Sequence, residues 1–265
     1  MQKFLSLSTI PLLALTLACG GGGERTEAPA QSAAPAAAAG GTTVDPATAG
    51  NVNGKVVLEG PAPKGEVIRM NADPVCMREA KGAQMTEFFV VGDGGSLGNV
   101  FVYVKDGLGN YTFPAPTEMV VLDQQGCRYH PHVFGIRVGQ PLEIVNSDPT
   151  LHNIHALPKD NKEFNTGQPI KGMKMAHTFT AAEVMVPFKC DVHGWMNAYV
   201  GVLDHPYFTV TADDGSFSIK DLPPGTYTLA AWHEKAGTKT ISVTVAAKET
   251  KADANFSFTA SAAGN

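Results

Sequence analysis

Four side chains in the second half of the sequence could together bind a soft metal ion. The segment Cys190-Asp-Val-His193-Gly-Trp-Met196 supplies a thiol, an imidazole and a thioether, and His152 lies 38 residues before Cys190. One thiolate, two imidazoles and a weakly bound thioether form the trigonal His₂Cys copper site with a long axial Met. We therefore predict a mononuclear copper site, alternating between Cu(I) and Cu(II), with His152, Cys190, His193 and Met196 as ligands.

The strand expected before this loop would point the thiol inward. In a strand over residues 183–190, Cys190 shares one face with Phe188, because side chains alternate with period two. His193 and Met196 then follow in a tight loop, where a three-residue step can return both to one ion. The remaining histidine must come from another strand.

His152 is the favoured ligand, because the strand with Leu142 and Ile144 and the Asp148-Pro149 turn after it deliver this residue. His155 follows it by three positions and would point to a different side of an extended segment. We therefore expect His155 at the surface or beside a ligand, and keep it as the alternative to His152.

The stretch 118–204 resembles a complete cupredoxin in length and strand pattern. Its ligand set resembles that of the plastocyanin and amicyanin family, and the short Cys-x-x-His-x-x-Met spacing is similar to the amicyanin variant. The resemblance implies a Greek-key β-sandwich that transfers single electrons between redox partner proteins. It also implies that Asn153 ties the two ligand loops together, and that electrons leave through an exposed edge of His193 in an apolar patch to which Trp195 could belong.

Four other segments resemble the carboxypeptidase regulatory-like, transthyretin-type β-sandwich. They are residues 54–63, 97–104, 214–219 and 222–229. Because the cupredoxin-like stretch separates them, we expect a smaller split sandwich of 51–117 plus 205–248 around a cupredoxin of 118–204. The alternative is an extended cupredoxin followed by a short appended sandwich, but a unit of about 60 residues would be marginally stable alone.

The composition favours an all-β protein. The 265 residues are 43% hydrophobic, and 28 Gly and 18 Pro punctuate short runs rich in Val, Ile, Thr and Phe. Such runs predict many short strands joined by tight turns. The expected strands cover 54–58, 87–91, 98–105, 118–122, 132–138, 141–146, 177–180, 183–190, 197–203, 207–211, 216–219, 225–232 and 239–246, and 249–265 is expected to be a flexible tail.

Charge and motifs exclude several function classes. A formal net charge of -5 gives no basic footprint for nucleic acid. No Ser-His-Asp order, paired-carboxylate pattern or nucleotide motif stands out, so nothing supports hydrolysis or hydride chemistry. The sequence therefore favours an electron carrier over an enzyme.

The first residues indicate export. Lys3 precedes an apolar stretch over 4–17, and Ala18-Cys19-Gly20 resembles the lipobox of bacterial lipoproteins. The resemblance implies a signal peptide over 1–19, an acylated Cys19 and a protein of the periplasm or cell envelope anchored to a membrane. The Gly, Ala and Pro-rich stretch 20–50 would be a disordered tether. Thr16 stands where the lipobox usually has Leu, so cleavage beyond Cys19, giving a soluble periplasmic protein, is the alternative.

Two cysteines remain once Cys19 and Cys190 are assigned. In an oxidising compartment, a disulfide between Cys76 and Cys127 is the simplest expectation. The segment Cys127-Arg-Tyr-His130-Pro-His132 offers a rival interpretation as a second metal site.

Three other functions stay open at this point. A copper-delivery lipoprotein would use Met173 and Met175 as additional thioethers for Cu(I). An enzyme similar to the red-copper cupredoxins would need an open copper position where Met196 is predicted. An adhesion or glycan-binding module would rest on the regulatory-like sandwich alone.

Overall fold

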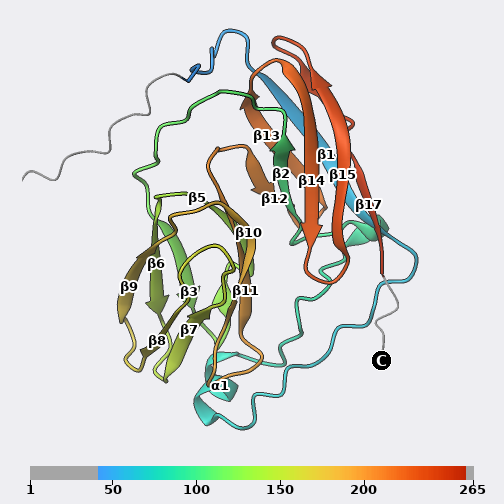
Figure 1. The fold of residues 1–265 in the computed structure, drawn as a ribbon. Coiled ribbons are helices and arrows are strands. Elements are labelled where there is room, and N and C mark those ends of the chain that lie inside the picture. The colour runs from blue at the N-terminus through green and yellow to red at the C-terminus, as the bar shows by residue number, and fades with distance from the viewer. Residues whose placement is uncertain (1–40, 261–265) are drawn as a thin grey trace, which may run out of the picture. The chain divides into compact units, whose positions relative to one another are not determined.

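Four β-sheets form the part of the chain that the structure, a computed structural model, describes, residues 41–260 (Figure 1). The all-β prediction is confirmed, because the described residues hold one short α-helix, α1 (Pro74–Glu79), and one 3₁₀ turn, η1 (Asp93–Gly95). The strands are β1 (Gly50–Glu59), β2 (Phe101–Asp106), β3 (Val120–Gln124), β4 (Tyr129–His130), β5 (Val133–Arg137), β6 (Pro141–Asn146), β7 (His152–Ala156), β8 (Phe164–Gln168), β9 (Lys174–Thr178), β10 (Glu183–Lys189), β11 (Asn197–Leu203), β12 (Phe208–Val210), β13 (Ser216–Leu222), β14 (Gly225–His233), β15 (Gly237–Val245), β16 (Thr250–Lys251) and β17 (Phe256–Thr259).

Strands β3 to β11 build one β-sandwich, which we call the inner sandwich. Its sheets have the orders β4-β3-β6-β9 and β5-β11-β10-β7-β8. Alternating burial along β6 sends Leu142 and Ile144 into the same core as Val186 and Phe188 of β10. Period-two alternation is what a sheet with one buried face requires. Each sheet contains one parallel pair, β3 with β6 in the first and β5 with β11 in the second.

The remaining strands build a second sandwich, which we call the outer sandwich. Its sheets have the orders β13-β1-β16, with β17 also on β1, and β12-β2-β14-β15. Strands β1 and β2 precede the inner sandwich in the sequence and β12 to β17 follow it. Val56 of β1, Val102 of β2 and Leu229 of β14 share one buried core. Each sheet of the outer sandwich therefore combines segments from both sides of the inner sandwich.

A third apolar cluster joins the two sandwiches, which belong to one compact unit of the chain. Phe101 of β2 packs over Gly201 of β11 and Gly135 of β5. A Cβ on Gly201 would lie 2.3 Å from Phe101 Cζ, which no side chain tolerates. Glycine at these positions thus permits the aromatic ring to approach the neighbouring backbone.

Several sequence predictions fail at the edges of the fold. The tether expected over 20–50 ends earlier, because Thr42 exchanges backbone hydrogen bonds with Asn110 and Thr112, and Gly50 already begins β1. The flexible tail expected over 249–265 is wrong for 249–260, where β16 and β17 pair with β1. Phe256 and Phe258 enter the outer core, and this burial offsets the ordering of the segment.

The strand expected over 87–91 is instead an irregular segment with a single bridge from Val91 to Leu97. Its Phe89 and Val91 pack on the outer core from a loop, which explains the misleading apolar run. Strands β7 and β8 were not predicted, because their polar residues hide the alternation.

Predictions for the N-terminal segment fall outside the described residues. The signal peptide over 1–19, the acylated Cys19 and most of the tether lie there. Among the described residues, no helix has the length and apolar character needed to cross a bilayer.

Candidate metal centre

The loop between β10 and β11 gathers three of the expected ligands. The backbone N–H of Cys190 donates to the Met196 carbonyl at 3.1 Å, and the N–H of Met196 donates to the His193 carbonyl at 2.9 Å. These bonds close a tight loop whose two ends are paired in the sheet at Lys189 and Asn197. The loop buries Cys190, His193 and Met196 at the edge of the inner core.

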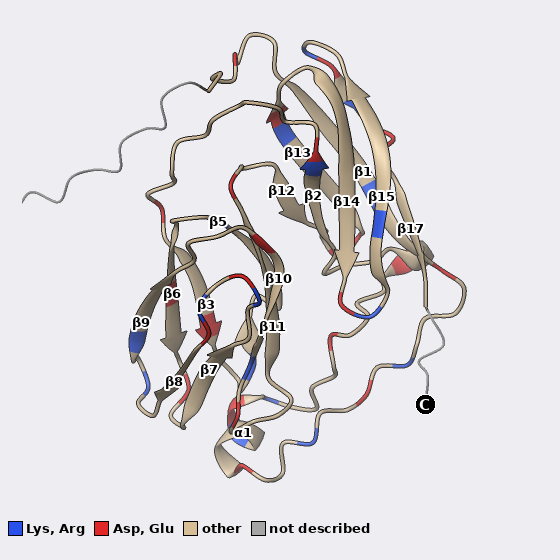
Figure 2. Cartoon of the chain, viewed as in Figure 1, with Lys and Arg blue, Asp and Glu red and all other residues tan. Residues whose placement is uncertain are grey.

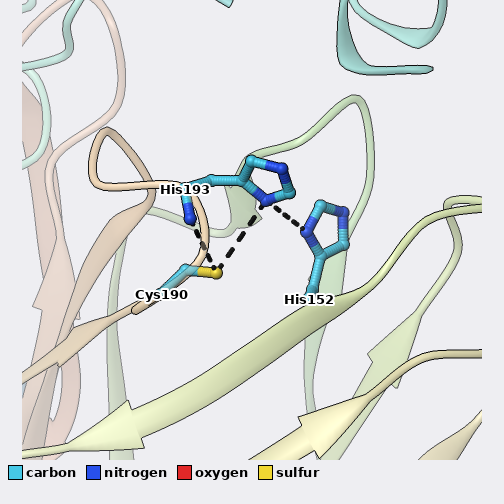
Figure 3. Close-up of side chains that lie close together, drawn as sticks. All are labelled: His152, Cys190 and His193. Carbon is cyan, nitrogen blue, oxygen red and sulfur yellow. Dashed lines mark hydrogen bonds between the residues drawn. The ribbon is translucent and has the colours of Figure 1, made fainter. Parts of the chain in front are cut away.

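The fourth expected ligand comes from the neighbouring strand. His152 is the first residue of β7, which pairs with β10 through Ala156 and Phe188. This pairing brings His152 Nδ1 to 3.0 Å from His193 Nδ1, and Cys190 Sγ lies 3.9 Å from the same His193 atom (Figure 3). Ligand atoms of His152, Cys190 and His193 all lie within 4.8 Å of one another. The structure therefore brings three of the four predicted ligands to one point.

Each histidine of this cluster binds a carboxylate on its far side. His152 Nε2 lies 2.9 Å from Asp148 Oδ2, and His193 Nε2 lies 3.0 Å from Asp73 Oδ2. A carboxylate accepts, so each Nε2 is the N–H donor and each neutral ring keeps its lone pair on Nδ1. Such partners fix the tautomer and the orientation of histidines that bind metals.

The donor set fits a soft or borderline cation. The two Nδ1 atoms and the Cys190 sulfur face one another, and a bound cation or a shared proton between them would stabilise this arrangement. Imidazole and thiolate ligands together suit copper, and Met196, which carries the thioether expected of a His₂Cys centre, is buried in the same loop.

The surroundings also prepare the thiol for metal binding. Burial opposes ionisation of Cys190, but the adjacent His152 and His193 side chains and nearby backbone N–H groups outweigh it and lower the pKa of the thiol to about 6. The thiolate, which is the ligand form, is therefore the main species at neutral pH. Burial lowers the pKa of each histidine, and hydrogen bonds to Asp148, Asp73 and Cys190 reverse this, so both pKa values are raised. The site thus favours positive charge.

Asn153 connects the two segments that carry the ligands. Its Oδ1 accepts the backbone N–H of Asp191 at 2.7 Å and lies 3.2 Å from Cys190 Sγ. Its Nδ2 donates to Asn165 of β8 at 2.7 Å, and the Tyr129 hydroxyl donates to its carbonyl. These contacts hold β7 against the start of the Cys190 loop.

The two remaining cysteines form a disulfide. Cys76 of α1 and Cys127 are bonded, with an S–S distance of 2.00 Å and a Cα separation of 5.5 Å. The rival site of Cys127, His130 and His132 is not assembled, since His130 Nε2 lies 3.2 Å from the Gln125 carbonyl and His132 Nε2 lies 2.6 Å from Glu234 Oε1.

Other candidate residues lie outside the cluster of His152, Cys190 and His193. His155 is bracketed by Asp191 and Glu163, each 2.9 Å from one ring nitrogen. Met173 is 36% exposed in the loop before β9, and Met175 packs on the rim of the inner core.

The expectation of an exposed His193 edge is wrong. His193 is only 3% exposed, because the chain between β1 and β2 crosses this end of the inner sandwich and places Asp73 and Cys76 on the ring. Trp195 packs beside the ring, with centroids 5.0 Å apart, and donates its indole N–H to the Cys127 carbonyl.

Sequence reasoning missed Asp73 and Asp148. Asp73 directly before Pro74 is the signature of a helix start, with the Asp as N-cap and Pro at the first helical position. That pattern predicts α1, but it does not show that the second carboxylate oxygen reaches a histidine 120 positions away. Asp148 precedes His152 by four positions in the turn after β6, where a bond to the histidine could have been considered.

Comparisons with known proteins cover separate parts of the chain. The family model of the carboxypeptidase regulatory-like domain matches residues 196–259, from β11 to the end of β17. No curated protein matches the chain.

Three solved structures are similar to part of the chain. A Cu-containing nitrite reductase (NirK) from Thermus scotoductus SA-01 is 22% identical over 37% of this chain, with a TM-score of 0.31, and the match spans 24% of the reductase chain. A mutant of amicyanin in its Cu(I) form is 23% identical over 32% of this chain and 81% of its own, with a TM-score of 0.29. A purple cupredoxin from Nitrosopumilus maritimus is 22% identical over 31% of this chain and 98% of its own, with a TM-score of 0.28.

Proposed function

We propose that the protein binds one copper ion at His152, Cys190, His193 and Met196 and passes single electrons between redox partner proteins. The observation that carries this proposal is the close approach of the two Nδ1 atoms beside the Cys190 sulfur, with both Nε2 atoms held by carboxylates. When bound there, copper supplies a one-electron couple between Cu(I) and Cu(II).

The residues of the chain supply a rigid, dry setting for that couple. His152 sits in a paired strand, and the loop carrying the other ligands is closed by its own backbone bonds. The ligands are at most 3% exposed. A site whose side chains are locked in this way changes little when charge is added or removed, which favours electron transfer.

Electron transfer is favoured over catalysis because of Met196. Met196 is buried in the ligand loop, and its thioether would be the fourth ligand of a bound copper, which would leave no open position for a substrate. We infer an electron carrier and not an enzyme of the red-copper type. Charge does not point to a nucleic acid partner, since acidic and basic residues are interspersed along loops and strands (Figure 2).

Redox cycling of the copper-loaded protein tests this function. We expect one copper per chain and a reversible one-electron wave in the full-length protein. His152→Ala should lose both, whereas His155→Ala, which removes a histidine outside the cluster, should keep both. Wild-type protein that binds no copper, or two ions per chain, would contradict the proposal, and rapid surrender of Cu(I) to an acceptor without redox cycling would favour copper delivery.

We further propose that the protein is exported and tethered to a bacterial membrane through Cys19. The support is the apolar segment ending in Ala18-Cys19-Gly20 in the sequence. Cell fractionation of wild type and Cys19→Ala tests this proposal. Membrane-bound wild type and a displaced variant are expected, and two equally soluble proteins would refute it.

A further inference from the structure

The ring edge of His193 is covered by a segment from outside the inner sandwich. We call residues 70–80, which include α1, the cover segment. Asp73 Oδ2 lies 3.0 Å from His193 Nε2, and Cys76 Sγ lies 3.6 Å from the same nitrogen. These contacts leave His193 3% exposed. Solvent and partners therefore meet the cover segment before they meet this ligand.

The cover segment is fixed to the inner sandwich at several points. Met70, Cys76 and Ala80 belong to the same apolar cluster as Cys190. The disulfide from Cys76 to Cys127 ties the segment to the loop between β3 and β4. Figure 1 shows α1 at the end of the inner sandwich near β7 and β11, although α1 and β10 are far apart in the sequence. The cover is thus anchored both by packing and by a covalent bond.

The two oxygens of Asp73 have separate partners. Oδ1 caps α1 by accepting the backbone N–H groups of Val75 at 2.7 Å and Cys76 at 3.3 Å. Oδ2 lies 3.0 Å from His193 Nε2 and accepts the Thr150 hydroxyl at 3.1 Å. Because the helix cap fixes the orientation of the carboxylate, Oδ2 is held where the His193 N–H needs it. This carboxylate therefore connects the cover segment, the His152 side of the site and His193.

We propose that Asp73 is a positioning residue of the metal centre and that the cover segment closes the His193 edge. The inference rests on the proposed function and deepens it. Asp73 holds the Nε2–H, so His193 Nδ1 keeps its direction toward the other ligands. Its negative charge stabilises the more positive, oxidised state, which lowers the reduction potential. The closed edge slows the loss of Cu(I), because a competing ligand must first displace the cover.

The test compares Asp73→Asn with Glu79→Gln in the full-length protein. Asparagine is as good an N-cap as aspartate, so α1 should remain. Glu79 loses the same charge on the same helix but faces Arg78 instead of the metal centre. We expect Asp73→Asn to shift the equilibrium with a one-electron reference couple about tenfold toward reduced protein, or about 59 mV. Capture of Cu(I) by a bathocuproine chelator should accelerate at least fivefold, and Glu79→Gln should change neither quantity.

Other outcomes overturn the inference or separate it from the function. A folded, copper-loaded Asp73→Asn protein with wild-type potential and capture rate would show that Asp73 only caps α1. If wild-type protein binds no copper, the function fails, and the cover is then judged on metal-free protein by ¹⁵N NMR of the His193 ring. A slowly exchanging Nε2–H that becomes fast in Asp73→Asn supports the cover, and equal exchange in both refutes it.

Discussion

The Nδ1 atoms of His152 and His193 face each other at 3.0 Å, although the two residues are 41 positions apart. Both rings use their Nε2–H on a carboxylate, so neither Nδ1 has a proton to offer in the neutral form. Together with the adjacent Cys190 sulfur, the two Nδ1 atoms present three donor atoms that a cation bound between them would satisfy.

Replacing Met196 by leucine separates the axial position from the other ligands. The volume is similar, so the buried loop should remain folded. Copper and colour should be retained, and the reduction potential should rise because an electron-donating ligand to Cu(II) is lost. Voltammetry measures the reduction potential, and azide titration tests for an open position at the copper. Unchanged spectrum and potential in the variant, or azide binding to wild-type copper, would place the thioether elsewhere and favour an open-site enzyme.

Removing the disulfide should destabilise the fold without removing the ligands. Cys76 and Cys127 are 51 positions apart, and closing a loop of that length stabilises by about 4 kcal/mol in the chain-entropy model. We expect urea unfolding of Cys76→Ser/Cys127→Ser to show a loss of this order, with wild-type copper stoichiometry. A loss of less than about 1 kcal/mol would mean that packing alone holds the cover segment.

Glycine at position 201 tests the junction between the sandwiches. An alanine Cβ there would lie 2.3 Å from Phe101 Cζ, so the ring must move and the variant should lose about 1–3 kcal/mol of unfolding free energy. Gly167→Ala is the matched control, because its Cβ would only touch Leu151 Cδ1 at 3.9 Å. Equal stability of the two variants would show that Phe101 does not pack on Gly201 in solution.

His233 should make the outer sandwich sensitive to acid. Burial lowers its pKa to about 4; Glu234 opposes this shift, and His132 and Lys235 add to it. Between pH 6.5 and 4 the unfolded chain gains a proton that the folded chain does not bind. The free energy of unfolding therefore falls as the pH falls through this window, by on the order of 3 kcal/mol, and no further below pH 4.

His233→Asn provides the comparison for this effect. Asparagine can still accept the backbone N–H groups of Lys235 and Ala236 that His233 Nδ1 binds. Chemical unfolding should be measured at intervals from pH 7 to pH 4. The free energy of unfolding should depend less steeply on pH in the variant, by the equivalent of about one proton taken up on unfolding. The same slope in both proteins would mean that His233 is protonated in the folded state.

The ligand loop could be predicted from the sequence because its chemistry is local. Cys190, His193 and Met196 lie within one loop, and the period of the preceding strand sets the direction of Cys190. The partners of the rings could not be predicted in the same way. Asp73 reaches His193 only because the chain between β1 and β2 crosses the inner sandwich, and no periodicity reports such a crossing.

The sequence predicts strands where apolar and polar residues alternate, and it does not predict strands in which polar residues occupy buried positions. β6 alternates regularly, so its bounds match. β7 carries His152 and Asn153 on buried positions, and these polar residues remove the alternation that marks a strand. The sequence does not predict β17, because the polar residues before Phe256 resemble a flexible tail. The structure orders this segment by pairing it with β1, which is distant in the sequence.

The spectrum of the copper-loaded protein tests the central claim most directly. If His152, His193 and the Cys190 thiolate hold one Cu(II), wild-type protein should show an intense visible thiolate-to-copper charge-transfer band and the EPR signal of a single mononuclear Cu(II). Cys190→Ser should abolish that band, because the thiolate is the chromophore. A colourless wild-type protein with stoichiometric Cu(II), or an unchanged band in Cys190→Ser, would contradict the account.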